Sequence, residues 1–283
     1  MMQKEVPQIF NPRAQRLALE RAQSRMTKNG PSFLLMRSAE DAASRIADIN
    51  RQFERAVVLS AIDMRKDILS LLPNDRRPKS LDWVPTQDAL NGDYDLIINL
   101  LTLQSINDLP GELKGLSAKL RPDGLFMGAL FGGDTLLNLR QVFYHIDQMI
   151  FGGATARVYP MIDHQQAASL LGHVGLNLPV VDKDRVKVSY KNFMTLVNDL
   201  RDLGLTNTLT TRHTEKFPKD ILKLIQSAYP KNEDSKFPAQ FEILWLTGWS
   251  PHESQQKPLK PGSAKTSLAE SLREIRDQKA TDS

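Results

Sequence analysis

The chain has 283 residues, of which 41% are hydrophobic and 25% charged, a balance typical of a globular protein with one large α/β domain and additions. It has no cysteine, which excludes disulfides, thiolate metal sites and cysteine nucleophiles and fits a reducing cytoplasm, where we expect the protein to act. The net charge of +4 is mild, the five histidines are scattered, and no apolar run approaches the roughly 20 residues of a membrane span. We therefore expect no nucleic-acid partner, no metal and no membrane span.

Residues 1–52 are predicted to form an N-terminal helical segment. Apolar residues recur there at helical spacing, at Phe10, Ala14, Leu17, Ala18 and Ala22. The Asn-Gly-Pro sequence at 29–31 ends this first helix, and a second helix begins near Ser32. Basic residues between Arg13 and Lys28 lie mostly off the apolar stripe. We interpret them as a solvated face, with a partner-docking helix as the alternative.

Strands alternate with helices in the main domain, residues 53–250. Strands are expected at residues 56–60, 78–85, 93–103, 125–130, 179–190 and 241–250. Helices are expected at residues 63–72, 109–120, 135–150, 164–174, 193–203 and 219–227. Asp63 is the expected N-cap of the first of these helices, and the Arg-Pro-Asp-Gly sequence at 121–124 is an expected turn.

This order predicts an α/β fold with a mostly parallel sheet, helices on both faces and an antiparallel pair of strands at the end of the chain. The strand at 179–190 alternates apolar and polar residues, which is typical of an antiparallel edge strand with one solvated face. A helical insertion at about 191–230 separates the last two strands, and residues 251–283 form a polar C-terminal arm.

The sheet is predicted to lack one strand–helix unit near its start. Between Ser60 and Tyr94 there are 33 residues, 61–93, and a helix takes about ten of them. Because a parallel crossover needs about a dozen residues, there is room for one more short strand but not for two strands with a full helix between them.

Several stretches together resemble one family over residues 10–268. They are "LPGELKGLSAKLRPDGLFMGALFGGDTLLNLR", "VGLNLPVVDKDRVKVSY", "PAQFEILWLTGW" and "HESQQKPLKPGSAKTSL". The family is the methyltransferase-like assembly factor of respiratory complex I in its alphaproteobacterial form, with a looser likeness to the carrier-protein methyltransferases of the biotin pathway. The resemblance implies a seven-stranded class I methyltransferase fold, S-adenosylmethionine as cofactor, and a complex I subunit as partner. For some members it implies arginine hydroxylation of a subunit.

The cofactor loop departs from the pattern of cofactor-binding members. In those members the first strand ends in an acid and a G-x-G-x-G loop, whose glycines let the backbone approach the ligand. Here Ser60 takes the place of the acid, and Ile62, Met64 and Lys66 take the places of the glycines. We therefore expect the side chains of Ile62 and Met64 to fill the space of a cofactor.

Two further positions of this pocket also depart from the family. Asp82 or Asp88 would have to replace the acid that binds the ribose, and Gln104-Ser105 stands where related sequences have a His–Trp pair. The degenerate cofactor pocket predicted by the resemblance comprises Ser60, Ile62, Met64, Asp82, Leu101 and Gln104. We expect little or no binding of S-adenosylmethionine in the usual mode.

A second candidate site, for a substrate or partner, follows the later strands. In "FGGDTLLNLR", Gly132 and Gly133 permit an unusual turn, Asp134 or Thr135 could cap the next helix and leave N–H groups for an anion, and Arg140 could pair with a carboxylate. The alternative is an ordinary capped turn.

The remaining members of the second candidate site are Arg157, which together with Tyr159 in "ATARVYP" resembles a family-specific loop after the long helix, and Trp249 and His252 after the last strand. Loop packing and anchoring of the C-terminal arm are the alternatives for these residues. Asp95 is expected to cap or solvate the start of a strand. No catalytic constellation stands out, and the catalytic residues stay unassigned.

Two functions fit these observations. The chain is a methyltransferase-family protein that serves complex I assembly by modifying or chaperoning a subunit, or it is a catalytically inactive scaffold for protein interactions. The loop without glycine favours the second function.

Overall fold

The computed structural model describes residues 6–212 and 220–256. The chain divides into two compact units, Met1–Pro251 and His252–Ser283. Most of the expected C-terminal arm, from residue 257, lies outside the described residues. The first unit contains both N-terminal helices and the sheet, so the N-terminal segment packs in the same unit as the main domain.

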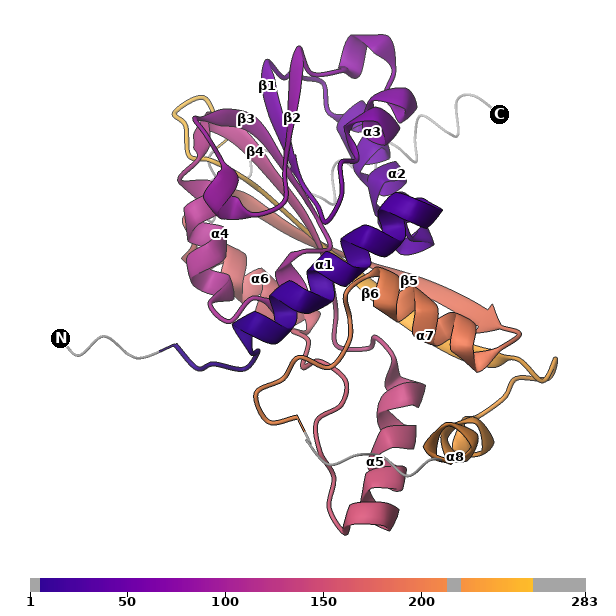
Figure 1. The fold of residues 1–283 in the computed structure, drawn as a ribbon. Coiled ribbons are helices and arrows are strands. Elements are labelled where there is room, and N and C mark those ends of the chain that lie inside the picture. Colours follow the sequence, from indigo (N-terminus) through magenta and orange to yellow (C-terminus); the bar gives the residue numbers. More distant parts are fainter. Residues whose placement is uncertain (1–5, 213–219, 257–283) are drawn as a thin grey trace, which may run out of the picture. The chain divides into compact units, whose positions relative to one another are not determined.

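Six strands form one mixed sheet in the order β2-β1-β3-β4-β6-β5 (Figure 1). Their bounds are β1 Arg55–Leu59, β2 Ser80–Val84, β3 Tyr94–Leu100, β4 Leu120–Phe131, β5 Asn177–Tyr190 and β6 Phe237–Trp249. The first four are parallel, β6 pairs antiparallel with β4, and β5 is the antiparallel edge strand. In the described part of the chain only β2 lies beyond β1, which confirms that one strand–helix unit of the seven-stranded pattern is missing.

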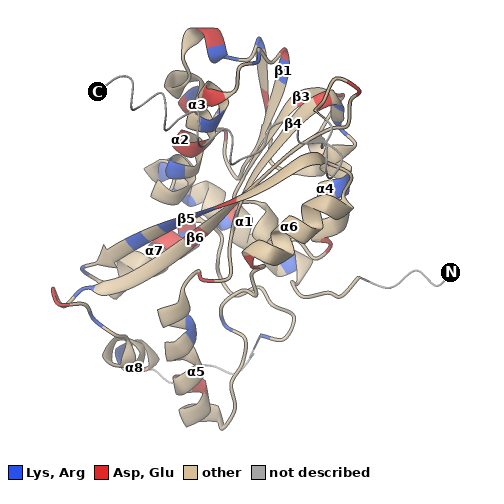
Figure 2. Ribbon diagram, turned by 180° about the vertical axis from the view of Figure 1, so that it is seen from behind, with Lys and Arg blue, Asp and Glu red and all other residues tan. Residues whose placement is uncertain are grey.

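Helices cover both faces of the sheet (Figures 1 and 2). Their bounds are α1 Pro12–Asn29, α2 Phe33–Asp48, α3 Arg65–Leu71, α4 Leu109–Ser117, α5 Leu137–Phe151, α6 His164–His173, α7 Phe193–Asp202 and α8 Ile221–Ala228. One buried cluster joins α2, α3, α5, α7 and α8 to one face of the sheet, and a second joins α4 and α6 to the other. The strands separate the two clusters because neighbouring residues such as Val57 and Val58 point to opposite faces.

The expected turn at 121–124 is part of β4 instead. Its pairing with β3 jumps from Tyr94↔Leu120 to Leu96↔Leu125, so the residues between them bulge out of the strand. Asp123 has a positive φ of 61°, and the Ser250 backbone N–H donates to the Gly124 carbonyl at 2.7 Å, which fixes the bulge to the end of β6. The Pro-Asp-Gly residues expected in a turn therefore form a bulge within β4.

Helix α3 begins later than its sequence suggests. Met64 is the N-cap residue and makes no capping bond with its side chain. The Asp63 carboxylate still accepts a hydrogen bond from the Arg65 N–H at 3.0 Å, so the expected cap residue acts one position outside the helix.

Asp95 is confirmed as a structural residue at a strand start. Its buried carboxylate accepts hydrogen bonds from the backbone N–H groups of Glu54, at 2.6 Å, and Arg55, at 2.9 Å. These bonds fix the start of β1 against β3, and so set the position of the loop that follows β1.

We expect Asp95→Asn to lower the free energy of unfolding by about 1.5–3 kcal/mol, because it removes a charged acceptor of two backbone N–H groups in a buried position. Asp93→Asn is the matched control, since Asp93 is exposed, and it should stay within about 0.5 kcal/mol of the wild type. Urea unfolding of the three proteins measures both effects, and equal stabilities would contradict this role of Asp95.

Candidate functional site

The loop after β1 lies at the carboxyl edge of the sheet, where ligands of such folds bind. β1 and β3 are neighbours with Leu59 opposite Asn99, so Ser60 and Leu101 follow at the same edge. Ser60 is buried, and its hydroxyl donates to the carbonyl of Ile62 at 2.6 Å. The Ser60 carbonyl accepts a hydrogen bond from the Trp83 indole at 3.2 Å. The polar groups of Ser60 are thus bonded within the loop and to β2.

Met64 and Ile62 face the core. Met64 has 0% of its surface exposed and belongs to the main buried cluster, and the half-buried Ile62 packs against that cluster. None of residues 60–66 has a positive φ. The loop therefore has a conformation that ordinary residues adopt without strain, unlike a glycine-rich loop. Lys66 lies in the first turn of α3 and is exposed.

Asp82 and Asp88, the expected replacements for the ribose-binding acid, both lie away from the residue that directly follows β2. Asp82 is in the middle of β2, where its carboxylate lies 3.4 Å from the Arg55 guanidinium. β2 ends at Val84, so no carboxylate follows it directly. Asp88 is exposed in a short 3₁₀ turn after β2.

The end of β3 contains two incompletely bonded amides. Gln104 donates from Nε2 to the Leu101 carbonyl at 2.6 Å, while its Oε1 has no hydrogen-bond partner among the described residues. Asn99 accepts a hydrogen bond from the Thr102 hydroxyl at 2.8 Å, and its buried Nδ2 has no partner among the described residues. Leu101 has a positive φ of 54°, which turns the chain sharply after β3.

Helix α1 crosses this edge of the sheet (Figure 1). Gln23 donates from Nε2 to the Ala61 carbonyl at 2.8 Å, directly after β1. Gln15 donates to the Ser105 carbonyl after β3, and the Asn107 side chain accepts from the Phe10 N–H at 2.8 Å. The N-terminal segment is therefore hydrogen-bonded to the loops that follow both central strands.

The loop after β1 is closed by hydrogen bonds within the chain. It contains no glycine, the Ser60 hydroxyl is bonded to the Ile62 carbonyl, and the Ala61 carbonyl is bonded to Gln23 of α1. No group of three or more acidic or histidine residues in the described ranges could hold a metal ion.

The Gly-Gly-Asp-Thr turn after β4 is fixed to β6. The Gly132 N–H donates to the Glu242 carbonyl at 2.8 Å, and the buried Thr135 hydroxyl exchanges hydrogen bonds with the Glu242 backbone at 3.0 and 3.1 Å. Asp134 pairs with Arg185 at 3.0 Å. The N-cap of α5 is Leu136, without a side-chain bond, so the expected cap by Asp134 or Thr135 is wrong. The side chains of Asp134 and Thr135 bind residues of β5 and β6 instead.

The side chain of Glu242 leaves no room for a side chain at Gly132, the first glycine of this turn. The Glu242 side chain is only 2% exposed and lies 3.4 Å from the Lys183 ammonium and 3.6 Å from the Arg185 guanidinium. A Cβ on Gly132 would lie 2.5 Å from Glu242 Oε1, while a Cβ on Gly133 would meet nothing closer than 3.9 Å.

We expect Gly132→Ala to lower the free energy of unfolding by about 1–3 kcal/mol, because the new methyl group displaces a buried, ion-paired carboxylate. Gly133→Ala is the matched control and should be close to neutral. Thermal or urea unfolding of the two variants decides the matter, and equal stability of both would show that the Glu242 side chain does not constrain this turn.

Arg157 and Asp147 form a buried ion pair between α5 and the loop after it. The distance from Arg157 Nη2 to Asp147 Oδ1 is 2.7 Å, and the Thr155 hydroxyl donates to Asp147 at 2.6 Å. Burial acts to raise the pKa of Asp147, but the hydrogen bonds from Arg157 and Thr155 outweigh it and hold that pKa below its usual value. This pair shapes the loop from which Tyr159 projects.

Tyr159 and Arg140 lie next to this loop. The Tyr159 hydroxyl donates to the Thr206 carbonyl at 2.8 Å, and burial raises its pKa. Arg140 donates to the Tyr159 carbonyl at 3.3 Å, and burial lowers the pKa of its guanidinium. The structure thus brings Arg140, Arg157 and Tyr159 together near α5.

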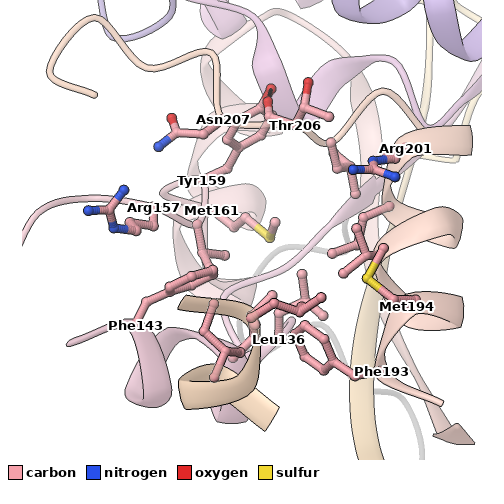
Figure 3. Close-up of a pocket in the computed structure, with 17 residues that line it drawn as sticks. Leu136, Phe143, Arg157, Tyr159, Met161, Phe193, Met194, Arg201, Thr206 and Asn207 are labelled. Atoms are coloured by element: carbon pink, nitrogen blue, oxygen red, sulfur yellow. Dashed lines mark hydrogen bonds between the residues drawn. The ribbon is translucent and has the colours of Figure 1, made fainter. Parts of the chain in front are cut away.

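A cavity of about 470 Å³ opens beside these residues, between α5, α7, α8 and the loops at 157–161 and 205–207 (Figure 3). Its walls are largely apolar, with Phe143 from α5, Met161 from the first loop, and Phe193 from α7. Such a volume is in the range of small-molecule sites. A second cavity of about 250 Å³ adjoins it, because Phe143 and Arg157 line both.

Trp249 does not join these residues. Trp249 is opposite Leu125, at the amino end of the parallel strands, and its ring lies 5.7 Å from the guanidinium of Arg51. His252 belongs to the second unit, where its Nδ1 is hydrogen-bonded to the Ser254 hydroxyl at 2.7 Å.

Sequence reasoning did not find the cavity or the buried acids Asp147 and Glu242. Asp147 is an acid on the apolar stripe of α5, four residues after Phe143, and this position already indicates a buried partner. The walls of the cavity come from segments up to about 90 residues apart, from Leu136 to Ile225, and no local pattern in the sequence connects them.

Comparison with known proteins shows that the chain is similar to NDUFAF5 proteins and to carrier-protein methyltransferases. It is 30% identical over 294 residues to the arginine-hydroxylase NDUFAF5 of Danio rerio, and the match covers 92% of this chain and 91% of that protein. It is 32% identical over 185 residues to the malonyl-[acyl-carrier protein] O-methyltransferase of Xylella fastidiosa, over 65% of this chain and 58% of that one. The chain spans only 41% of the length of the Dictyostelium discoideum NDUFAF5 protein that it also matches.

No family model matches the chain. Among solved structures, the 1,6-didemethyltoxoflavin-N1-methyltransferase of Burkholderia thailandensis is 13% identical with a TM-score of 0.42, over 88% of this chain and 94% of that one. This likeness is too weak to carry an inference. The sheet described above and the sequence relationship give the chain a class I methyltransferase-like fold. The chain belongs to the family of methyltransferase-like assembly factors of respiratory complex I that includes the NDUFAF5 proteins.

Proposed function

We propose that this chain serves the assembly of respiratory complex I by binding one of its subunits, and that it keeps the methyltransferase fold as a scaffold without the usual cofactor. Membership of the NDUFAF5 family supports the proposed role in complex I assembly. The observation that carries the scaffold role is the loop after β1, in which Met64 is fully buried in the core and the Ser60 hydroxyl is bonded to the Ile62 carbonyl.

The free energy needed to open this loop favours the proposal. A cofactor in the usual position requires the loop to move, which takes the Met64 side chain out of the main cluster and breaks the Gln23–Ala61 hydrogen bond. Exposing a buried Met side chain costs about 1.5–3 kcal/mol, before any cost of the cavity that it leaves. No acidic residue directly follows β1 or β2, so no carboxylate there could offset this cost by a hydrogen bond to the ribose of the cofactor.

Modification of the bound subunit is the second candidate. Several NDUFAF5 relatives are named arginine-hydroxylases, so an arginine side chain of the partner is the group to examine. Mass spectrometry of the partner subunit, purified from cells with and without this chain, distinguishes the two roles. A mass increase of one oxygen on an arginine only in cells with this chain favours modification.

We place this role in the cytoplasm, which fits a chain without cysteine. In the described ranges no helix is long and apolar enough to cross a membrane. We propose that the partner is a subunit or subunit domain in aqueous surroundings.

We expect isothermal titration calorimetry to detect no binding of S-adenosylmethionine or S-adenosylhomocysteine to the purified chain at micromolar concentrations. The physical reason is the closed loop at Ser60, Ile62 and Met64. A homologous methyltransferase with an intact glycine-rich loop is the positive control. Micromolar affinity for either ligand would refute the absence of the usual cofactor mode.

We expect affinity purification of the tagged chain from cells to recover a complex I subunit without bound S-adenosylmethionine. The eluate is analysed by mass spectrometry for both proteins and small molecules, with the tag alone as control. Recovery of the subunit together with stoichiometric cofactor would favour an enzyme over a scaffold. Recovery of neither would contradict the proposed role in complex I assembly.

A further inference from the structure

The cavity between α5, α7 and α8 has two different sides (Figure 3). Leu136, Phe143 and Phe193 lie along one side, and Arg201, Thr206 and Asn207 lie along the opposite side. The space has a volume of about 470 Å³, is open to solvent on one side, and has walls that are mostly apolar. Water in such a space finds few hydrogen-bond partners on its apolar side.

The polar side retains unused hydrogen-bonding capacity among the described residues. Asn207 donates from Nδ2 to the Ala156 carbonyl at 3.1 Å, which leaves its second N–H. The Thr206 hydroxyl makes no hydrogen bond that the described residues supply. Arg201 donates only to the Asn198 side chain, at 3.4 Å, and has no carboxylate partner within 4.0 Å in the described part of the chain.

The described residues that line the cavity include two arginines, Arg157 and Arg201. No Asp or Glu is among its described lining residues. The charge of Arg157 is balanced by the buried Asp147, so Arg201 contributes the unbalanced positive charge. A guanidinium or ammonium ligand would meet this charge without a counter-ion, whereas a carboxylate would gain charge-assisted hydrogen bonds.

We propose that this cavity binds an amphiphilic carboxylate of the fatty-acid class. Its apolar chain lies against Leu136, Phe143 and Phe193, and its carboxylate accepts hydrogen bonds from Arg201, Thr206 and Asn207. The site is separate from the loop after β1 and does not depend on the role proposed for that loop. It also differs in charge from a site for an arginine side chain.

The ligand class is tested with the full chain and a series of saturated carboxylates, from hexanoate to dodecanoate, each below its micelle concentration. We expect calorimetry to show an affinity that rises about fourfold for each added CH₂ group until the cavity is filled. 1-Decanol, which has the same chain without the charge, should bind about tenfold or more weakly than decanoate. No binding of any member up to millimolar concentration, or equal affinity of decanol and decanoate, would overturn the proposal.

The place of binding is tested with variants of α7. Val197→Phe narrows the cavity and Arg201→Gln removes the charge, and each should weaken decanoate binding about tenfold or more with an unchanged melting temperature in the ligand-free protein. Arg16→Gln, an exposed arginine of α1, is the matched control and should bind as the wild type does. If Val197→Phe unfolds, Arg201→Gln still tests the place of binding, because Arg201 is exposed and its substitution should leave the protein folded. Unchanged affinity of a folded α7 variant would place the ligand elsewhere and overturn the proposal.

Discussion

Burial of the loop after β1 is the constraint on which the account of this protein depends. Met64 is held in the main core by the same cluster that contains α2 and α3, and the Ser60 hydroxyl and the Gln23 amide bind the carbonyls of Ile62 and Ala61. Asp95 fixes the start of the strand that leads into this loop. The carboxyl edge of the sheet is therefore part of the packed structure, where such folds otherwise keep room for a ligand.

The family and the strand order are those of a methyltransferase-like protein, while the residues of the loop after β1 pack and bond with one another. A cavity of about 470 Å³ lies between the helices that follow β4 and β5, where the Asp147–Arg157 pair and Tyr159 connect the loop at 157–161 to α5 and to the loop after α7. A scaffold that binds a subunit fits this arrangement, because binding needs a stable surface and no strained cofactor loop.

Much of the fold could be predicted from the sequence, because local patterns determine it. The apolar run in β3, the alternation in β5 and the short span between Ser60 and Tyr94 predict the strands, the edge position and the missing unit. Details that depend on tertiary partners could not be predicted. Thr135 bonds to the Glu242 backbone instead of capping α5, because that partner is more than 100 residues away in the sequence.

The candidate site was predictable to a smaller extent. The loss of glycines is visible in the sequence, but the burial of Met64 and the crossing of α1 depend on packing between distant segments. Arg157 and Tyr159 were found from a resemblance, whereas their partners Asp147 and Thr206 come from a helix and a loop that no motif joins to them. The polar side of the cavity could not be predicted for the same reason, since Arg201 comes from α7 and Asn207 from the loop after it.

The most direct test of the central claim observes the Met64 methyl group itself. The chain, with its nine methionines labelled by ¹³C at the methyl carbon and Met64 assigned through Met64→Leu, is examined by NMR with and without S-adenosylmethionine at millimolar concentration. The Met64 methyl signal should keep its position and line width, because the side chain stays in the core. A shift of that signal which saturates with ligand concentration would show that the loop opens to hold the cofactor, and would contradict the account.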